Sequence, residues 1–135
     1  MLEVKTPFPK TLIINQNEIK FDQKIGTVLQ LPDKVVVLLA THSFQFGDPM
    51  VGRNLLAYDA GGNLVWRIED HGAVIRARPE DKVTKPDENG VRWIPQSVLE
   101  VEISEKTGLV EATLPHWILE IDPETGKILD ARYNR

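Results

Sequence analysis

Two histidines and two aspartates form the most reactive set of side chains in this sequence. His42 and Asp48 lie in one stretch, and Asp70 and His71 are adjacent in another. Imidazole nitrogens and carboxylate oxygens together bind zinc and other divalent metals. The third histidine, His116, is remote, and no pair of histidines has the spacing of two on a strand or four on a helix. We predict no metal site, and keep convergence of the first four residues in space as the alternative.

The residue inventory gives little support to catalysis. The chain has no cysteine and no Gly-x-Ser-x-Gly turn, and His42 and Ser43 would point to opposite faces of an extended segment. No phosphate-binding or dinucleotide-binding glycine pattern is present. The sequence DPETGKILD at residues 122–130 has its glycine at the fifth position, whereas a calcium loop needs it at the sixth. We predict a protein that is not an enzyme, with no catalytic residues and no cofactor.

Length and composition are those of an ordinary globular domain. The 135 residues contain 41% hydrophobic and 27% charged side chains, enough for one sizeable core. The longest apolar run, VVVLLA at residues 35–40, is too short to span a bilayer and is typical of a buried strand. The first ten residues lack a secretory pattern, and disulfides are excluded. We expect one domain over residues 1–135, in the cytoplasm and without a membrane segment.

The negative charge is concentrated in the last third of the chain. Acidic and basic side chains number six and six in residues 1–66, six and six in residues 67–92, but eight and four in residues 93–135, which accounts for the net charge of -4. A nucleic-acid-binding protein would show a cluster or stripe of Lys and Arg. We therefore predict no nucleic-acid partner, and expect a charged protein partner to be basic.

The apolar pattern predicts an all-β protein. Period-two alternation and short apolar runs recur, separated by Gly, Pro, Asn and Asp, and no window shows a helical stripe. We expect a single-domain antiparallel meander that forms a curved sheet, a sandwich or a barrel, with Trp66, Trp93 and Trp117 largely buried. The predicted strands are residues 11–15, 18–21, 27–31, 34–40, 54–58, 64–68, 73–78, 91–94, 98–104, 109–114, 117–121 and 127–133.

Two segments, 41–52 and 79–90, interrupt this rhythm. The first carries Phe44, Phe46 and Met50, which either fold back as a lid on the core or form an exposed apolar patch. Because exposed apolar patches mark protein interfaces, Phe44 and Phe46 are candidate partner-binding residues. The second segment is almost wholly polar, and we expect it to be the most mobile.

Two stretches, LLAYDAGGNLVW at 55–66 and LEIDPETGKIL at 119–129, share Leu, Asp, a Gly turn and a second aliphatic residue. They resemble the blade motif of quinoprotein-type β-propellers, in which an Asp precedes a Thr-Gly-Lys turn and a following Trp docks neighbouring blades. Trp66 would be that Trp in the first copy. The end of the chain is also similar to small bacterial proteins of no known activity that finish in a DPETGKIL hairpin.

The spacing of the two copies excludes a propeller. Asp59 and Asp122 are 63 positions apart, whereas a blade spans about 40–50 residues and closure needs about four blades. The resemblance therefore implies no quinone cofactor for this chain. We predict two hairpins with type I or G1-bulge turns.

The last strands can be registered through their turns. If residues 105–108 form a four-residue loop and residues 115–116 a two-residue turn, Glu102 faces Glu111, and Glu111 faces Glu120. One face is then charged. The other is apolar and collects Leu99, Val101, Ile103, Val110, Ala112, Leu114, Trp117, Leu119 and Ile121.

Like charges opposite one another destabilise a sheet, so this register needs an explanation. Either water and nearby cations such as Lys106 or Arg132 absorb the repulsion, or the row docks a basic partner. The candidate partner-binding residues are Glu100, diagonal to the row, with Glu102, Glu111 and Glu120.

The leading hypothesis is a small, soluble, non-enzymatic protein-binding module, such as an immunity protein or inhibitor that masks a basic toxin or nuclease domain. The alternative is a small-molecule- or metal-binding β-barrel, enzymatic or not, with His42, Asp48, Asp70 and His71 near one rim. A third hypothesis is a structural protein with homo-oligomeric edges. A cavity on which those four residues converge would favour the barrel.

Overall fold

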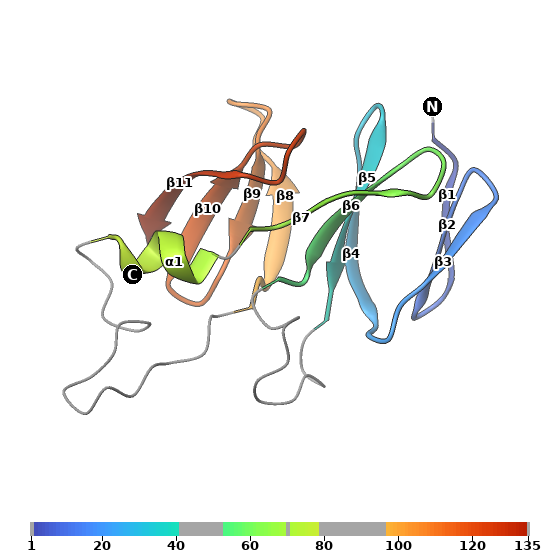
Figure 1. Ribbon diagram of the computed structural model, residues 1–135, viewed down its shortest axis with the longest axis horizontal. Helices are drawn as coiled ribbons and strands as arrows, with labels where there is room; N and C mark the ends of the chain where they lie inside the picture. The colour runs from blue at the N-terminus through green and yellow to red at the C-terminus, as the bar shows by residue number, and fades with distance from the viewer. Residues whose placement is uncertain (1, 41–52, 70, 79–96, 135) are drawn as a thin grey trace.

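The computed structural model describes residues 2–40, 53–69, 71–78 and 97–134, and these form a stack of three antiparallel sheets (Figure 1). The N-terminal sheet contains β1 (Val4–Phe8), β2 (Thr11–Ile14) and β3 (Asn17–Lys20). The central sheet contains β4 (Ile25–Gln30), β5 (Lys34–Leu39), β6 (Leu55–Asp59) and β7 (Leu64–Arg67). The C-terminal sheet contains β8 (Glu100–Ile103), β9 (Val110–Thr113), β10 (Trp117–Ile121) and β11 (Ile128–Tyr133).

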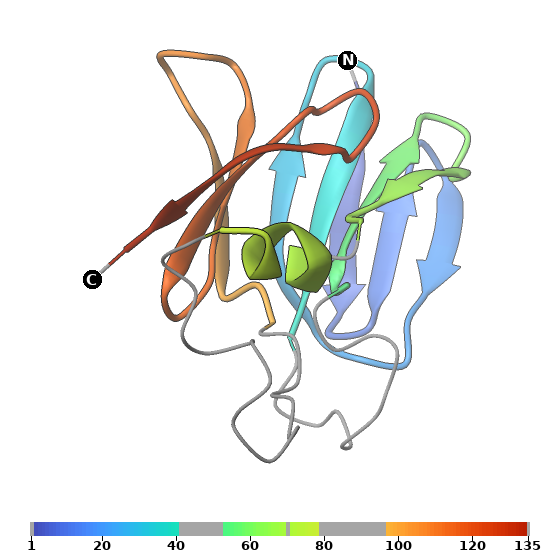
Figure 2. The same ribbon diagram turned by 60° about the vertical axis from the view of Figure 1, so that its left-hand side comes forward.

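Strands that follow one another in the chain are neighbours within each sheet, which confirms the predicted antiparallel meander. Of the predicted forms, the sandwich is the one found: over the described residues the sheets are layered face to face, and they close neither a barrel nor a propeller (Figure 2). The hairpin loops between consecutive strands are short enough to keep neighbours antiparallel. The central sheet is therefore covered on both sides.

The sequence VVVLL in β5 shows the effect of this double cover. All six residues of β5 are buried. Because side chains alternate across a strand, Val36 and Leu38 face the C-terminal sheet, and Val35, Val37 and Leu39 face the N-terminal sheet. A strand covered on both faces has no polar side, which is why its sequence reads as a continuous apolar run.

Two cores result, one on each side of the central sheet. The first core, toward the C-terminal sheet, contains Trp66 and Trp117, whose exposed fractions are 6% and 0%. The burial predicted for these two residues is confirmed, and Trp93 lies outside the described residues. The second core, toward the N-terminal sheet, contains Leu2, Leu12, Ile14, Val35, Val37, Leu39, Leu56 and Tyr58. Each fully buried large aliphatic side chain contributes about 1.5–3 kcal/mol.

The strand predicted at residues 73–78 is wrong, because helix α1 (His71–Arg76) takes that part of the chain. His71 and Ile75 are both fully buried, and their spacing of four places them on one face of a helix. The adjacent β-branched residues Val74 and Ile75 favour a strand locally, but burial at helical spacing decides the outcome. No helix in the described ranges is long and apolar enough to cross a membrane.

Strand β1 was not predicted, because prolines at positions 7 and 9 break the strand pattern. β1 is an edge strand with a register shift between Lys5 and Phe8, and such strands tolerate proline. The strand predicted at residues 91–94 lies outside the described residues.

Leu55→Ala should lower the free energy of unfolding by about 2–5 kcal/mol, because it empties a fully buried position in the first core. Leu64→Ala is the matched control, since Leu64 is 55% exposed, and it should cost less than about 1 kcal/mol. Urea denaturation of both variants measures the difference. Equal losses would contradict the described packing.

Candidate binding surface

The predicted row of glutamates is present on the C-terminal sheet. Glu102 of β8 pairs with Glu111 of β9, and Glu111 pairs with Glu120 of β10. Glu120 pairs in turn with Asp130 of β11, so four carboxylates cross all four strands. We call Glu102, Glu111, Glu120 and Asp130 the acidic row. Neighbouring members are on strands about 4.8 Å apart.

The opposite face of the same sheet packs on the first core, as predicted for seven of its nine residues. Leu99 is the exception, with 56% of its surface exposed, and Ile103 is half-buried. β8 is an edge strand, and its first ladder pair is Glu100 with Thr113. Leu99 comes before that pair, so no neighbouring strand beyond β8 covers its side chain. The residues confirmed as buried are Val101, Val110, Ala112, Leu114, Trp117, Leu119 and Ile121.

Two arginines neutralise part of the acidic row. Arg132 Nη2 lies 3.5 Å from Glu111 Oε2, and Arg78 Nη2 lies 2.8 Å from Asp130 Oδ1. The compensation expected from Arg132 is therefore present. Glu102 and Glu120 have no ion pair with any residue that the structure describes. The row thus keeps two uncompensated carboxylates, on alternate strands.

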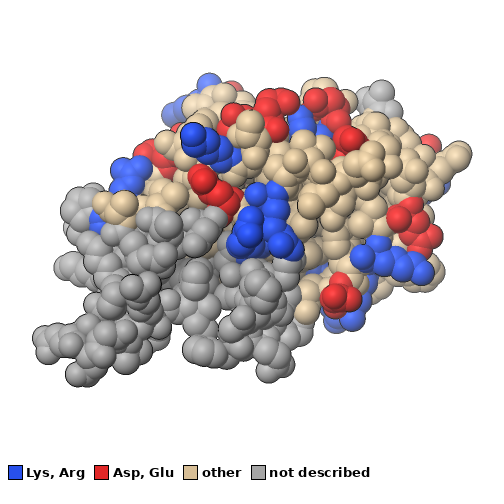
Figure 3. Space-filling model, viewed as in Figure 1, with Lys and Arg blue, Asp and Glu red and all other residues tan. Residues whose placement is uncertain are grey.

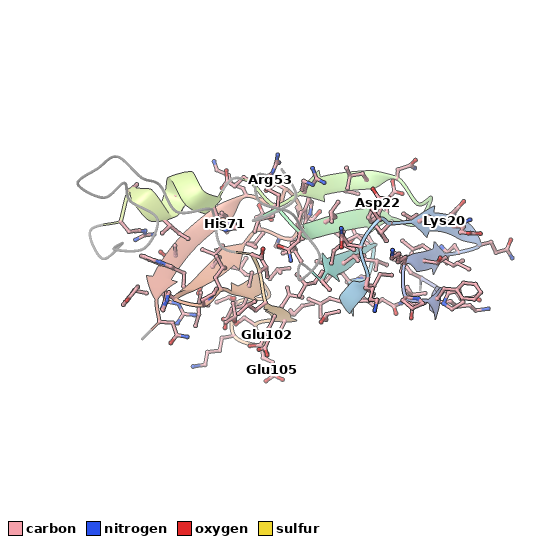
Figure 4. All side chains as sticks on the ribbon, turned by 90° about the horizontal axis from the view of Figure 1, so that it is seen from below. Lys20, Asp22, Arg53, His71, Glu102 and Glu105 are labelled. Atoms are coloured by element: carbon pink, nitrogen blue, oxygen red, sulfur yellow. The ribbon has the colours of Figure 1, made fainter. Side chains whose placement is uncertain are left out.

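A groove of about 540 Å³ lies over the row. Its floor includes Glu102, Glu111, Glu120 and Arg132, and the β8–β9 loop, with Glu105 and Lys106, forms a wall. Figure 4 shows Glu102 and Glu105 close together at one margin of the molecule, away from Lys20 and Asp22. Cationic groups entering this groove would meet carboxylates from three strands and the loop.

Charges are mixed on the side of the molecule seen in Figure 3, where described Lys and Arg side chains lie among Asp and Glu. The N-terminal sheet follows the same rule, since Lys5 pairs with Glu3 at 3.1 Å and Lys20 with Glu18 at 3.4 Å. The acidic row differs from these surfaces because its like charges are direct neighbours in the ladder.

The β10–β11 turn, residues 122–127, sets the geometry of the row's last two strands. Asp122 Oδ1 accepts a hydrogen bond from the backbone N–H of Glu124 at 2.9 Å, and Gly126 has a φ of 76°. The register shifts directly after the turn, between the pairs of Ile121 and Glu120. This bulge has Leu129 as its extra residue, and it brings Asp130 opposite Glu120. The G1 bulge predicted for the hairpin lies in the turn itself, where Gly126, at positive φ, and Lys127 both hydrogen-bond to Asp122.

The β6–β7 turn, residues 59–63, has the same construction. Asp59 Oδ1 accepts hydrogen bonds from the backbone N–H groups of Asn63 and Gly61 at 2.9 and 3.0 Å, and Gly62 has a φ of 79°. The hydrogen bond from Asn63 is the main cause that holds the pKa of Asp59 below its usual value. The sequence similarity between residues 55–66 and 119–129 therefore reflects two turns of similar geometry.

Trp66 joins the two hairpins across the first core. Its Nε1–H donates a hydrogen bond to the carbonyl oxygen of Pro123 at 2.7 Å. The indole packs so closely on Gly126 that a Cβ at that position would lie 2.6 Å from a ring carbon. Glycine is required here both for its positive φ and for this contact.

A similar contact joins the N-terminal and central sheets. Asn17 Nδ2 donates to the carbonyl oxygen of Ala60 at 3.2 Å, and a Cβ on Gly62 would lie 2.9 Å from Asn17 Cβ. Ala60 and Pro123 both directly follow the aspartate of their turn. The N-terminal and central sheets thus each donate a side-chain N–H to the next sheet's turn. In both cases the acceptor is the carbonyl oxygen of the residue that follows the turn's aspartate.

Two further side chains bind the β10–β11 turn to the central region. Lys34, which is 3% exposed, lies 2.9 Å from Asp33 and 3.1 Å from Glu124. Burial alone would lower the pKa of Lys34, but hydrogen bonds to the two carboxylates outweigh it, and the pKa is raised. Glu69 Oε1 accepts a 2.6 Å hydrogen bond from the backbone N–H of Ile128. Sequence reasoning missed these contacts, which join residues far apart in the chain.

Of the four residues considered for a metal site, the structure describes His71 alone. His71 is fully buried at the start of α1, and His42, Asp48 and Asp70 lie outside the described residues. So do Phe44, Phe46 and Met50 of the first long segment. Among the described residues, no group of three or more His, Asp or Glu side chains could hold a metal ion.

A second groove, of about 660 Å³, lies between β1 and β4 at the margin of the second core. None of its lining residues has a titratable side chain: they are Val4, Thr6, Pro7, Phe8, Pro9, Ile25, Gly26, Val28 and Gln30. The side chains that line it therefore include no carboxylate, imidazole or amine.

Comparison with protein-family models gives a match over most of the chain. A protein-family model described as a domain of unknown function (DUF7957) matches residues 2–113. No curated protein and no solved structure matches the chain. The matched residues end with Thr113, the last residue of β9, so Glu120 and Asp130 lie beyond them.

Gly126→Ala should destabilise the protein by more than Gly108→Ala. Both glycines have a positive φ, 76° and 72°, and this conformation costs an L-residue about 1–2 kcal/mol. A Cβ at Gly108 meets nothing within 4 Å, whereas at Gly126 it strikes the Trp66 ring. We expect an added loss of about 1–3 kcal/mol at Gly126 from overpacking. Urea denaturation checks this, and similar losses would show that the contact with Trp66 is loose.

Asp33→Asn should lower stability near pH 7, and the loss should shrink in acid. The hydrogen bond from Lys34 is the main cause that holds the pKa of Asp33 below 3.8. The stabilisation is therefore present above pH 3.8 and is lost as the pH falls through the lower pKa of the folded protein. In a Lys34→Met background the effect of the substitution and its change with pH should be much smaller, because the main cause of the lowered pKa of Asp33 is then absent. Urea titrations across this range measure it, and a loss that does not change with pH would contradict the ion pair.

Proposed function

We propose that this chain, which belongs to the family of domains of unknown function DUF7957, is a non-enzymatic protein-binding module that docks a basic partner on its C-terminal sheet. The observation that carries the proposal is the acidic row, in which four carboxylates are direct neighbours across four strands. The docking surface consists of Glu100, Glu102, Glu111, Glu120 and Asp130.

Stability alone does not account for the row. Each pair of like charges directly opposite one another costs about 0.2–1 kcal/mol, and the row contains three such pairs. The arginines at Glu111 and Asp130 relieve the repulsion only in part, because both ion pairs are partly exposed to solvent and Glu102 and Glu120 form none with a described residue. Carboxylates kept at this cost are available for a partner that supplies the missing cations.

The chemistry of the partner follows from the groove. Arg132 already lies on Glu111, which indicates that a guanidinium fits over the row. A partner that presents Lys or Arg toward Glu102 and Glu120 would complete the compensation. Complementary charge of this kind raises association rates and selects among partners. A small immunity protein or inhibitor that masks a basic toxin or nuclease domain is the concrete form of this proposal.

The composition of the stack favours a second role for the same face. A layered protein needs a polar outer face on its terminal layer to remain monomeric, and Asp130 stands at the register position that Trp66 occupies in the preceding hairpin. On this hypothesis the acidic row prevents another sheet from packing on β8–β11, and no partner binds there.

A capture experiment with a matched control separates the two roles. The tagged protein is incubated with an extract of its native organism at low salt, and bound proteins are eluted with rising salt and identified. The docking role predicts a basic protein that is retained by wild type and by Glu3→Gln/Glu18→Gln, which loses the same charge from the N-terminal sheet.

Glu102→Gln/Glu120→Gln should release that basic protein at lower salt and bind it at least about tenfold more weakly, because electrostatic steering contributes factors of this size. Surface plasmon resonance with the purified partner measures the affinity. If both double variants bind as wild type does, the acidic row is not the docking surface.

A further inference from the structure

Asn54 is a fully buried polar residue that joins two distant parts of the chain. Its Nδ2 donates hydrogen bonds to the carbonyl oxygens of Leu39 and Val98 at 2.9 and 3.0 Å. The backbone N–H of Val98 donates to Asn54 Oδ1 at 3.1 Å. An amide group has two N–H donors and one acceptor oxygen, so all its polar atoms are engaged.

The three residues stand at the ends of two long segments, 41–52 and 79–96. Leu39 is the last residue of β5, just before the first segment. Asn54 follows that segment and directly precedes β6. Val98 follows the second segment and lies two residues before β8. The places where the chain leaves β5, enters β6 and enters β8 therefore meet at one side chain.

Each side also has backbone hydrogen bonds that do not involve the Asn54 side chain, and one of them runs from the N–H of Leu39 to Asn54 O at 2.9 Å. The backbone N–H of Ala40 donates to Lys24 O at 2.7 Å, which ties the end of β5 to the chain before β4. The backbone N–H of Leu99 donates to Thr113 O at 2.8 Å, which ties the start of β8 to β9. Asn54 is the described side chain that hydrogen-bonds to both sides.

We propose that Asn54 couples the end of β5 to the start of β8, so that movement on one side loosens the other. If Val98 moves away, the amide loses two of its three hydrogen bonds, and its polar atoms are left buried without partners. The remaining hydrogen bond to Leu39 then keeps the amide buried with its other polar atoms unpaired, which weakens that bond's net contribution. Because coupling is reciprocal, displacement of Leu39 weakens the attachment of Val98 to the same extent.

Native-state hydrogen exchange tests the coupling in the wild-type protein. The backbone amides of Ala40 and Leu99 are the reporters, because neither donates to Asn54. Coupling predicts that both exchange through one opening, with the same dependence on low concentrations of denaturant. Openings with clearly different denaturant dependence would overturn the proposal.

A variant provides the second measurement. Asn54→Leu removes all three side-chain hydrogen bonds and leaves those of Ala40 and Leu99 to their own partners. Exchange should accelerate at both reporters by about 5- to 150-fold, the range of typical coupling. The control is Ile14→Val in the second core, which destabilises the protein without touching Asn54. Acceleration at one reporter alone, or at neither beyond the control, would overturn the proposal.

Discussion

The packing of Trp66 on Gly126 is the contact on which the position of the C-terminal sheet depends. Among the described residues the sheets share no ladder hydrogen bonds with one another, so side chains largely decide how the C-terminal sheet sits on the central sheet. The Trp66 indole fills the space above a glycine that could carry no side chain, and its N–H holds Pro123 O at 2.7 Å. Lys34 and Glu69 bind the same turn on either side, through Glu124 and Ile128. Three side chains from the central region thus converge on one turn.

The contact between a side-chain N–H and a turn carbonyl occurs twice in the stack. Asn17 donates a hydrogen bond to the carbonyl oxygen of Ala60, and Trp66 donates one to that of Pro123. The two junctions between neighbouring sheets therefore use the same kind of hydrogen bond. In the last hairpin the corresponding position holds Asp130, which accepts a hydrogen bond from Arg78 and offers no donor. The outer face of the C-terminal sheet is consequently polar, and the acidic row lies on it. A bulge in β11, at Leu129, aligns Asp130 with Glu120.

The alternation of apolar and polar residues, together with the lengths of short turns, was sufficient to predict strand register within a hairpin. The loops at residues 105–108 and 115–116 fixed the register of β8 to β10, and a single-residue slip would have moved every side chain to the other face. For that reason Glu102, Glu111 and Glu120 could be placed in one row, and β5 could be recognised as a buried strand. Asp130 was missed because the bulge in β11 changes the count after the turn.

Features decided by distant contacts could not be predicted in this way. The helix at residues 71–76 depends on burial of His71 and Ile75 against other elements. The burial of Lys34 depends on Glu124, which is 90 positions away. The position of the C-terminal sheet on the central sheet depends on Trp66 meeting Gly126, and the sequence echo showed only that the two hairpins were alike.

The central claim is that the acidic row is kept at a cost to stability. The most direct test is the free energy of unfolding of Glu102→Gln/Glu120→Gln, measured without a partner at low and at high salt. The account predicts that the variant is more stable than wild type at low salt, by up to about 1–2 kcal/mol, and that the gain shrinks as salt screens the repulsion. A variant less stable than wild type at low salt would show that the row supports the fold, and would contradict the account.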